Sequence, residues 1–413
     1  MPNADAVAPQ TPPPDAPPAA VADGPLTGIR VIDLTAVVLG PMCTRELADF
    51  GADVIKIEPP AGDMMRSNGV SLHPGMSSIY LALNRNKRSV VLDLKTEAGR
   101  QALAKLIEGA DVFIHNMRVP AIEKLGFGYA AVQRINPRIV YCAATAFGQE
   151  GPYRSRPAFD DVIQASCGLV GVNAIGHDTP AYIPSLIADK TTGLAVASAV
   201  LAALVCQQRH GLGQYVEVPM LETMTAFTLT EHMGGMTFPG NSTAPAGYAR
   251  LLHGGRQPWP TADGWIALLP YTERHWRAFF TYMGREDLIE QYGIADRQRR
   301  NANIQKIYGE LRHVTRTKTT AEWLAICDQI DVPCAPIYDL DELPAHPHLQ
   351  AVKLFEQSQH PTEGPIRQVR PPARFSRTPT RVRWPAPSLG AHTAEVLAQA
   401  GIAEDAVAPA PPA

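Results

Sequence analysis

Residues 28–58 read GIRVIDLTAVVLGPMCTRELADFGADVIKIE, and this stretch contains the clearest signal for the fold class. The β-branched runs IRVIDL and DVIKIE predict two strands, and TRELADFG between them predicts a helix that ends at Gly51. A strand, a helix and a second strand within about 30 residues form a β-α-β unit, whose two strands lie parallel.

The same alternation continues to about residue 147. SVVLDLKT (89–96), DVFIHN (111–116) and RIVYCAAT (138–145) predict further strands, and EAGRQALAKLIEGA (97–110) predicts an amphipathic helix closed by Gly109. Strands that alternate with helices build a parallel sheet covered on both faces. The predicted fold class is therefore α/β.

The rest of the chain divides by composition. Asp189 opens a long apolar helix, 191–208, which is followed by the strand-like QYVEVPM (214–220). We therefore predict a large domain over 25–222, a small α+β domain over 223–330 that is richer in Met, aromatic residues and turns, and a Pro-rich C-terminal segment over 331–401. The Pro/Ala-rich ends, 1–24 and 402–413, are predicted to be disordered tails.

Composition excludes several classes of partner. The 413 residues carry a net charge of −3, so no general basic field exists to hold nucleic acid or an anionic membrane. The six cysteines lack a CxxC pair or a histidine at metal spacing, which predicts free thiols in a reducing cytoplasm and no metal site. The N-terminus is not of the signal-peptide type, and the longest apolar run, 194–206, falls short of the roughly 20 residues that span a bilayer. We expect a cytoplasmic protein without a membrane span.

A β-α-β start in which Glu58 closes the second strand also invites a dinucleotide-binding interpretation. The loop after the first strand argues against it: TAVVLGPMCT contains one glycine, Gly40, where G-x-G-x-x-G is required for a pyrophosphate to approach the backbone. A nicotinamide enzyme is therefore disfavoured.

Several longer motifs, in a fixed order from about Leu26 to Gly401, give a more specific signal. They are the opening stretch through GDMMR, LNRNKRSVVLDLKTEAGR, DVFIHNMRVPAIEKLGFGYAAVQRINPRIVYC, FGQEGPY, IADKTTG, VPCAPIYDLDEL, HPHLQ, RFSRTP and SLGAHTAEVL. In these motifs the chain resembles the class III CoA-transferases, the family of formyl-CoA transferase and carnitine CoA-transferase.

The resemblance implies a Rossmann-like large domain built from both ends of the chain, a small middle domain, and a homodimer whose subunits interlock. It also implies that the substrates are an acyl-CoA and a small carboxylic acid. The CoA thioester would bind the large domain with its acyl end where the domains meet, and no cofactor would be permanently bound.

Asp189 matches the family's nucleophilic aspartate in the pattern D-x-x-x-G. The alternative interpretation is a helix N-cap, because Asp is favoured immediately before a helix. A position at a helix N-terminus would keep the carboxylate ionised at neutral pH. The resemblance favours the nucleophile, which would carry a mixed anhydride and then an enzyme–CoA thioester.

The remaining site residues follow from the same resemblance. Gly254 and Gly255 resemble the family's mobile glycine loop, whose N–H groups could stabilise an oxyanion, although two adjacent glycines also suit an ordinary turn. Groups expected along CoA are Arg66, Lys87, Arg88, Asn116, Met117, Arg118 and Lys124, because its phosphates require Lys or Arg. The segment Asn86-Lys87-Arg88 could instead be a solvated turn.

Two positions divide the family. The related α-methylacyl-CoA racemases carry a His–Asp pair where this chain has Phe159 and Asp160, and a phenyl ring cannot accept a proton. Asp160 and Asp161 are interpreted as helix caps. Val38 replaces the glutamine that formyl-CoA transferase uses near its acyl group, which disfavours oxalate and favours a larger acid such as succinate, glutarate or itaconate. A racemase and a non-catalytic CoA-binding protein remain the alternatives.

Overall fold

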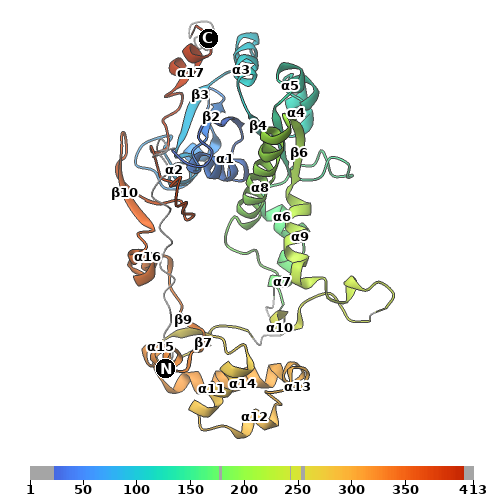
Figure 1. Ribbon diagram of the computed structural model, residues 1–413, viewed down its shortest axis with the longest axis vertical. Helices are drawn as coiled ribbons and strands as arrows, with labels where there is room; N and C mark the ends of the chain where they lie inside the picture. Colours follow the sequence, from blue (N-terminus) through green and yellow to red (C-terminus); the bar gives the residue numbers. More distant parts are fainter. Residues whose placement is uncertain (1–22, 176–178, 242, 253–255, 404–413) are drawn as a thin grey trace, which may run out of the picture. The chain divides into compact units, whose positions relative to one another are not determined.

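The computed structural model describes residues 23–175, 179–241, 243–252 and 256–403, which fall into two compact units. The first unit comprises the chain up to Thr145, Thr192–Val218 and the chain from Glu356 onward, and the second comprises Ala146–Thr191 and Pro219–Phe355 (Figure 1). The chain therefore leaves the first unit and returns to it twice.

The first unit is an α/β structure. Its elements are β1 (Arg30–Leu34), α1 (Leu39–Asp49), β2 (Asp53–Glu58), the 3-10 turn η1 (Met64–Ser67), α2 (Ser78–Asn84), β3 (Lys87–Val91), α3 (Glu97–Glu108), β4 (Val112–His115), α4 (Val119–Lys124), α5 (Tyr129–Ile135), β5 (Val140–Thr145), most of α8 (Ile187–His210), β6 (Gln214–Pro219), β10 (Phe355–His360), β11 (Gly364–Val369) and α17 (Thr393–Gln399).

A six-stranded sheet organises this unit, in the order β3-β2-β1-β4-β5-β6. The pairs β1–β2, β2–β3, β1–β4 and β4–β5 are parallel, with Ile32 opposite both Ile55 and Phe113. The strand order reverses between β1 and β4, and at such a switch point the flanking loops diverge and leave a crevice at the carboxyl ends of the strands. The predicted α/β class and parallel sheet are confirmed.

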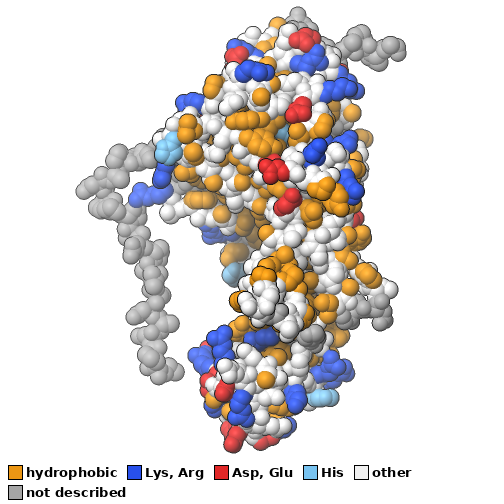
Figure 2. Space-filling model, turned by 90° about the vertical axis from the view of Figure 1, so that its right-hand side faces the viewer, with side chains coloured by type: hydrophobic (Ala, Val, Ile, Leu, Met, Phe, Trp, Pro, Cys, Tyr) orange, Lys and Arg blue, Asp and Glu red, His pale blue; other side chains and the backbone are white. Residues whose placement is uncertain are grey.

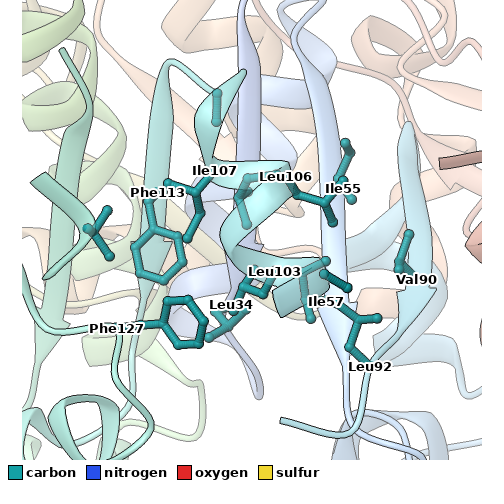
Figure 3. Packing of buried hydrophobic residues seen from close by; sticks show 14 of the residues in the cluster. Leu34, Ile55, Ile57, Val90, Leu92, Leu103, Leu106, Ile107, Phe113 and Phe127 are labelled. Carbon is teal, nitrogen blue, oxygen red and sulfur yellow. The ribbon is translucent and has the colours of Figure 1, made fainter. Parts of the chain in front are cut away.

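Helix α3 covers one face of the sheet. Its residues Leu103, Leu106 and Ile107 are buried among Ile55 and Phe113 of the strands (Figure 3). Every residue of β4 and β5 is buried, as is typical of parallel strands covered on both faces. The period-2 alternation of a half-exposed strand is accordingly missing from the sequence here.

The second unit is mainly helical. Its elements are α6 (Asp160–Ser166), α7 (Leu169–Asn173), the first turn of α8, α9 (Met220–His232), η2 (Gly234–Thr237), α10 (Ala249–Leu252), β7 (Trp259–Pro260), β8 (Trp265–Leu268), α11 (Glu273–Tyr282), α12 (Asp287–Gln291), α13 (Arg297–Ala302), α14 (Ile304–Val314), η3 (Thr315–Thr317), α15 (Thr320–Ile330), β9 (Cys334–Pro336), η4 (Leu340–Ala345) and α16 (Pro347–Ala351). A small antiparallel sheet, β7-β8-β9, and a core around Trp276, Phe279 and Trp323 hold it together.

Five predicted boundaries differ from those of the structure. Residues 146–191 and 331–355 belong to the second unit, because the chain lies outside the first unit between β5 and Thr192 and again between Val218 and Glu356. Helix α1 begins at Leu39, five residues before the predicted Thr44. Asp23, placed in the predicted N-terminal tail, forms an ion pair with Arg381 at 2.7 Å, and Ile402, placed in the other tail, packs on the core.

The C-terminal segment is attached to the first unit through Asn86. This residue has a left-handed backbone (φ 59°), and its side-chain oxygen accepts the N–H of Arg383 at 2.6 Å and of Trp384 at 3.2 Å. Its amide nitrogen donates to Asp49 at 2.8 Å. The NKR segment thus joins two distant parts of the chain.

Helix α8 is long and apolar enough to cross a membrane by length and composition, and 44% of its most apolar window is buried within the chain. It is nevertheless an internal element of the fold. Gln207 near its end donates to the carbonyl oxygens of Asp111 and Arg138, at 3.1 and 2.7 Å, and so fixes the helix to the large sheet. We assign α8 as a core helix that packs on the large sheet.

Candidate active site

A cavity of about 750 Å³ lies in the first unit at the carboxyl ends of its strands. It occupies the crevice that the switch point between β1 and β4 creates. Its lining includes the ends of four strands and the loops that follow them: Leu34, Thr35, Ala36, Lys56, Ile57, Glu58, Pro59, Gly62, Asp63, Met64, Leu92, Asp93, Leu94, Lys95, Arg100, Asn116, Met117, Ala121, Lys124 and Leu125. Apolar walls combined with a few polar groups are typical of a cofactor or substrate site.

Basic side chains at this cavity fall into two kinds. Lys56 is completely buried and donates to Asp63 at 2.9 Å and to the Thr35 carbonyl at 2.8 Å, so its charge is compensated. Lys95 and Lys124 are exposed, and Arg100 is partly exposed beside Glu97. The exposed cations are the groups able to bind the phosphates of a ligand.

The turn between β1 and α1 forms one wall of the cavity. The Asn116 side chain accepts the Ala36 N–H at 3.0 Å and donates to the Ala36 carbonyl at 2.7 Å. Val37 follows with φ 71°, a conformation that is unfavourable for a β-branched residue, and its N–H donates to Asp63 at 3.2 Å. Gly40 lies so close to Thr35 that a Cβ would overlap the threonine side chain. Gly40 is therefore needed for the close contact between α1 and Thr35, and it is not part of a glycine-rich phosphate-binding loop.

The structure separates the predicted CoA-binding residues. Asn116, Met117 and Lys124 line the cavity, whereas Arg66, Lys87, Arg88 and Arg118 do not. Sequence reasoning missed Lys95 and Arg100, which the loop after β3 and the start of α3 bring to it. The signal was present in the quoted motif VVLDLKTEAGR, because a basic residue just after a parallel strand lies at the ligand-binding edge of the sheet.

The four residues outside the cavity occupy other environments. Arg66 donates to Glu58 at 2.7 and 2.8 Å and lies 3.9 Å from the centre of the Tyr80 ring. Lys87 is completely buried against Asp33, Thr44 and Asn84. Arg88 pairs with Asp53 and Glu395, and Arg118 is the exposed residue before α4. The first three stabilise the fold through ion pairs.

Asp189 lies in the second unit, in the first turn of α8. The helix begins at Ile187, so Asp189 is the third helical residue, and the alternative interpretation as an N-cap is wrong. It is 7% exposed, and its carboxylate makes no hydrogen bond or ion pair with any residue that the structure describes. Within the described part of the chain it is thus a buried carboxylate without a compensating cation.

Two side chains of α6 hold the backbone around Asp189. Asp160 accepts the Asp189 N–H at 2.9 Å. Gln164 donates to the other Asp160 oxygen at 2.6 Å and to the Ser185 carbonyl at 3.2 Å, and it accepts the Ile183 N–H at 3.0 Å. Asp160 was predicted to cap its own helix, but Phe159 occupies that position and Asp160 bonds to α8 instead. The pair positions the turn that carries Asp189.

Burial and, to a smaller extent, the charges of Asp160 and Asp161 together raise the pKa of Asp189 to about 7. The helix N-terminus was expected to keep this carboxylate fully ionised at neutral pH. That expectation is wrong, because desolvation and two nearby acids outweigh the helix dipole. A carboxylate that titrates near neutrality is a more basic nucleophile than an ordinary aspartate.

The glycine of the D-x-x-x-G pattern, Gly193, has a packing role within the first unit. A Cβ at this position would lie 2.7 Å from the Leu39 carbonyl oxygen and 2.8 Å from the Met42 Cβ. A glycine therefore allows α8 to lie directly against α1. Asp189 and Gly193 are four residues apart because one helical turn separates the reactive end of α8 from its packing contact.

Three further predictions concern other residues. Phe159 is 64% exposed at the start of α6 and cannot act as a base. Val38 is 3% exposed and packs with Met65, Met76 and Tyr80, so its side chain is part of the core. Gly254 and Gly255 lie outside the described residues.

A crevice at the switch point of a parallel sheet and a buried, uncompensated aspartate together suit an enzyme that binds a large anionic ligand and forms a covalent intermediate. Residues 26–393 match the family model described as CoA-transferase family III, and the chain belongs to this family. It is a class III CoA-transferase, whose substrates are CoA thioesters and carboxylic acids.

Named relatives agree with this assignment. The chain is 34% identical over 387 residues to a succinate–glutarate CoA-transferase of Agrobacterium fabrum, covering 91% of this chain and 95% of that protein. It is 31% identical to the formyl-CoA:oxalate CoA-transferase of Escherichia coli O157:H7, covering 93% and 97%. The crystal structure of an aspartate-to-alanine mutant of Rv3272 from Mycobacterium tuberculosis superposes with a TM-score of 0.80 at 30% identity, covering 92% and 100%.

Proposed function

We propose that this enzyme transfers CoA from an acyl-CoA to a carboxylic acid through covalent intermediates on Asp189. The observation that carries the proposal is the state of this carboxylate, which is 7% exposed, lacks a cationic partner among the described residues and has a pKa of about 7. A purely structural aspartate at such a position would normally be paired or bonded.

The chemistry follows from the carboxylate. Its oxygen attacks the thioester carbonyl, the C–S bond breaks, and CoA leaves as a thiolate while a mixed anhydride forms. The thiolate attacks the aspartyl carbonyl and releases the donor acid as a carboxylate, which leaves an aspartyl–CoA thioester. The acceptor carboxylate attacks this thioester and again displaces the thiolate. Attack of the thiolate on the acceptor's carbonyl then gives the new acyl-CoA and restores Asp189.

An aspartate is required at this position because the acyl intermediates must react in both directions. The enzyme-bound intermediate must therefore be about as reactive towards nucleophiles as the thioester of CoA. Anhydrides and thioesters exchange readily, whereas a serine ester would not regenerate a thioester. The raised pKa of Asp189 fits this requirement, because a more basic carboxylate attacks faster at a pH where it is still ionised.

We assign CoA to the cavity of the first unit. Lys95, Arg100 and Lys124 would bind its phosphates, and Asn116 and Met117 would lie along the ligand, with Asn116 also fixing the β1–α1 turn. Arg66, Lys87 and Arg88 stabilise the protein and do not bind CoA in this proposal. Gly254 and Gly255 would supply oxyanion-stabilising N–H groups, as the resemblance implies.

The acceptor is proposed to be an aliphatic dicarboxylate, with succinyl-CoA as a donor. The support for this acceptor is the A. fabrum relative, which is named for succinate and glutarate. The racemase alternative is disfavoured by Phe159. A non-catalytic CoA-binding protein would have no need for a buried carboxylate of raised pKa.

We also propose that the enzyme is a cytoplasmic homodimer of interlocked subunits. Leu194 and Val205 of α8 are 47% and 52% exposed, and Phe227 of α9 is 50% exposed. Hydrophobic side chains are numerous on the face shown in Figure 2. Such side chains are more stable when a partner subunit covers them. Sedimentation analysis would reveal a monomer if this assignment is wrong.

The decisive experiment traps the intermediate. The purified enzyme is incubated with succinyl-CoA and then with hydroxylamine or borohydride, which convert an aspartyl thioester into a hydroxamate or an alcohol, and the peptide containing Asp189 is analysed by mass spectrometry. We expect the modified residue to be Asp189 and to be absent in Asp189→Asn. Lack of any adduct, together with exchange of the α-proton of a 2-methylacyl-CoA in deuterated water, would favour the racemase.

A further inference from the structure

A second cavity of about 750 Å³ lies entirely within the second unit. Four helices and the loop before α11 line it, through Tyr248, Ala249, Arg250, Tyr271, Thr272, Glu273, Arg297, Arg300, Asn301, Ala302, Ile304 and Gln305. None of these residues takes part in the chemistry assigned to Asp189 or in the proposed CoA cavity. The site therefore needs its own explanation.

Charge is concentrated in this cavity. Arg250 comes from α10, and Arg297 and Arg300 come from α13. Glu273 is the one acidic residue of the lining, and Arg277 pairs with it at 2.8 Å. Several Lys and Arg side chains are visible on the lower part of Figure 2, to which α11–α14 belong. The cavity thus attracts anions.

The Arg250 guanidinium is held in place by two tyrosines. One Nη donates to the Tyr308 hydroxyl at 3.2 Å, and the guanidinium lies 4.9 Å from the centre of the Tyr271 ring, which Arg256 also faces at 5.8 Å. Its Nε is buried and has no hydrogen-bond partner among the residues that the structure describes. A guanidinium that lines the cavity and is only partly bonded within the protein can bind an anionic ligand oxygen.

The lining matches a ligand with two charged ends and an apolar middle. Arg250 on one helix and the two arginines of α13 provide separate positions for two carboxylates, and Tyr271 and Ile304 provide apolar surface for a methylene chain. A single phosphate would use only one of these positions.

We propose that this cavity binds an aliphatic dicarboxylate, one carboxylate on Arg250 and the other on Arg297 and Arg300. The inference rests on the proposed function only in taking dicarboxylic acids as the ligands of this enzyme, and it assigns them a binding site in the second unit.

Isothermal titration of the full-length enzyme with glutarate, in the absence of CoA, tests the proposal. We expect saturable binding by the native enzyme and at least about tenfold weaker binding by Arg250→Gln and, separately, by Arg297→Gln. The matched control is Arg312→Gln, an exposed arginine of α14 outside the cavity, which should bind as the native enzyme does. Butyrate, with one carboxylate, should bind at least about tenfold more weakly than glutarate.

Contrary outcomes are equally specific. Unchanged affinity in both arginine variants, or phosphate binding as tightly as glutarate, would overturn the proposal. Because Arg297 is exposed, its variant remains informative if Arg250→Gln does not fold. Asp189→Asn should bind glutarate normally. An Asp189 adduct without glutarate binding would reject this site alone, and glutarate binding without an adduct would reject only the covalent mechanism.

Discussion

A buried aspartate in each unit has its pKa shifted, downward in the first unit and upward in the second. In the first unit Asp33 is completely buried, yet Lys87 and Lys56, with the Thr35 and Thr44 hydroxyls, outweigh its desolvation and hold its pKa below the ordinary value. In the second unit Asp189 is almost as buried, but its charged neighbours are the acids Asp160 and Asp161, and its pKa rises to about 7.

This comparison separates charges that stabilise a fold from charges that react. A buried carboxylate that is paired with cations and hydrogen-bond donors is difficult to protonate and is a poor nucleophile, because these partners stabilise its charge. A buried carboxylate without such partners is destabilised by its negative charge, and forming a covalent bond removes that charge. Groups of this kind occur mainly at functional sites. The same residue type therefore has a structural role at position 33, and we propose a chemical role for it at position 189.

The largest expected effect is the loss of the Asp189 nucleophile. Asp189→Asn should lower the rate of CoA transfer at least about 10³-fold, because an amide cannot form the anhydride. A steady-state assay with succinyl-CoA and glutarate measures the change. Residual transfer within tenfold of the native rate would show that another residue is the nucleophile.

The same variant should be more stable than the native enzyme at alkaline pH. The folded-state pKa of Asp189 lies above its unfolded value, so its favourable contribution is complete below the unfolded pKa and is lost as the pH rises through about 7. Asp189→Asn should therefore gain about 1–3 kcal/mol at pH 8 and less at pH 5. Urea unfolding at both values distinguishes this result from a variant that is inactive because it is misfolded.

In the first unit, Lys87→Met should lower the stability of the protein, whereas Asp189→Asn should raise it. It leaves Asp33 buried with its closest cation removed, which should cost about 3–5 kcal/mol of unfolding free energy. Lys95→Met, at an exposed position of the CoA cavity, should change stability by less than about 0.5 kcal/mol but raise the KM for the CoA thioester. Urea unfolding and kinetics on both variants compare the two lysines, and equal stability losses would contradict this division of roles.

Gly193→Ala should destabilise the protein by about 1–2 kcal/mol, because the overlap with α1 exceeds the gain in helix propensity. Gly309→Ala on α14 is the matched control, since an added Cβ there meets nothing within 4 Å. That variant should be stabilised by up to about 1 kcal/mol. Thermal unfolding of both proteins measures the difference, and a neutral Gly193→Ala would exclude a tight contact.

The smallest expected effect is a shift in pH dependence. Transfer should rise with pH through about 7 as Asp189 ionises. Asp160→Asn keeps an oxygen for the Asp189 N–H but removes a negative charge, so the limb of the kcat/KM profile should move to lower pH. Asp161→Asn should move it less, because Asp161 is the weaker of the two influences. A limb unchanged in both variants would exclude Asp189 as the titrating group.

The sequence alone is sufficient to place the six strands of the large sheet in chain order and to assign the family. These depend on local signals: β-branched runs, the amphipathic stretch before Gly109, and motifs that are continuous in the chain. Asp189 was also identified in this way, because a helix start and the D-x-x-x-G pattern are both local.

Only the tertiary structure decided what the charged residues do. Lys87 appears no different from Lys95 in the sequence, but its partner Asp33 lies 54 residues away, so its burial could not be inferred from its neighbours. The raised pKa of Asp189 likewise depends on Asp160, 29 residues earlier. Charge compensation is a property of distances in space, and the order of residues along a chain does not fix those distances until the sheet and its helices have packed.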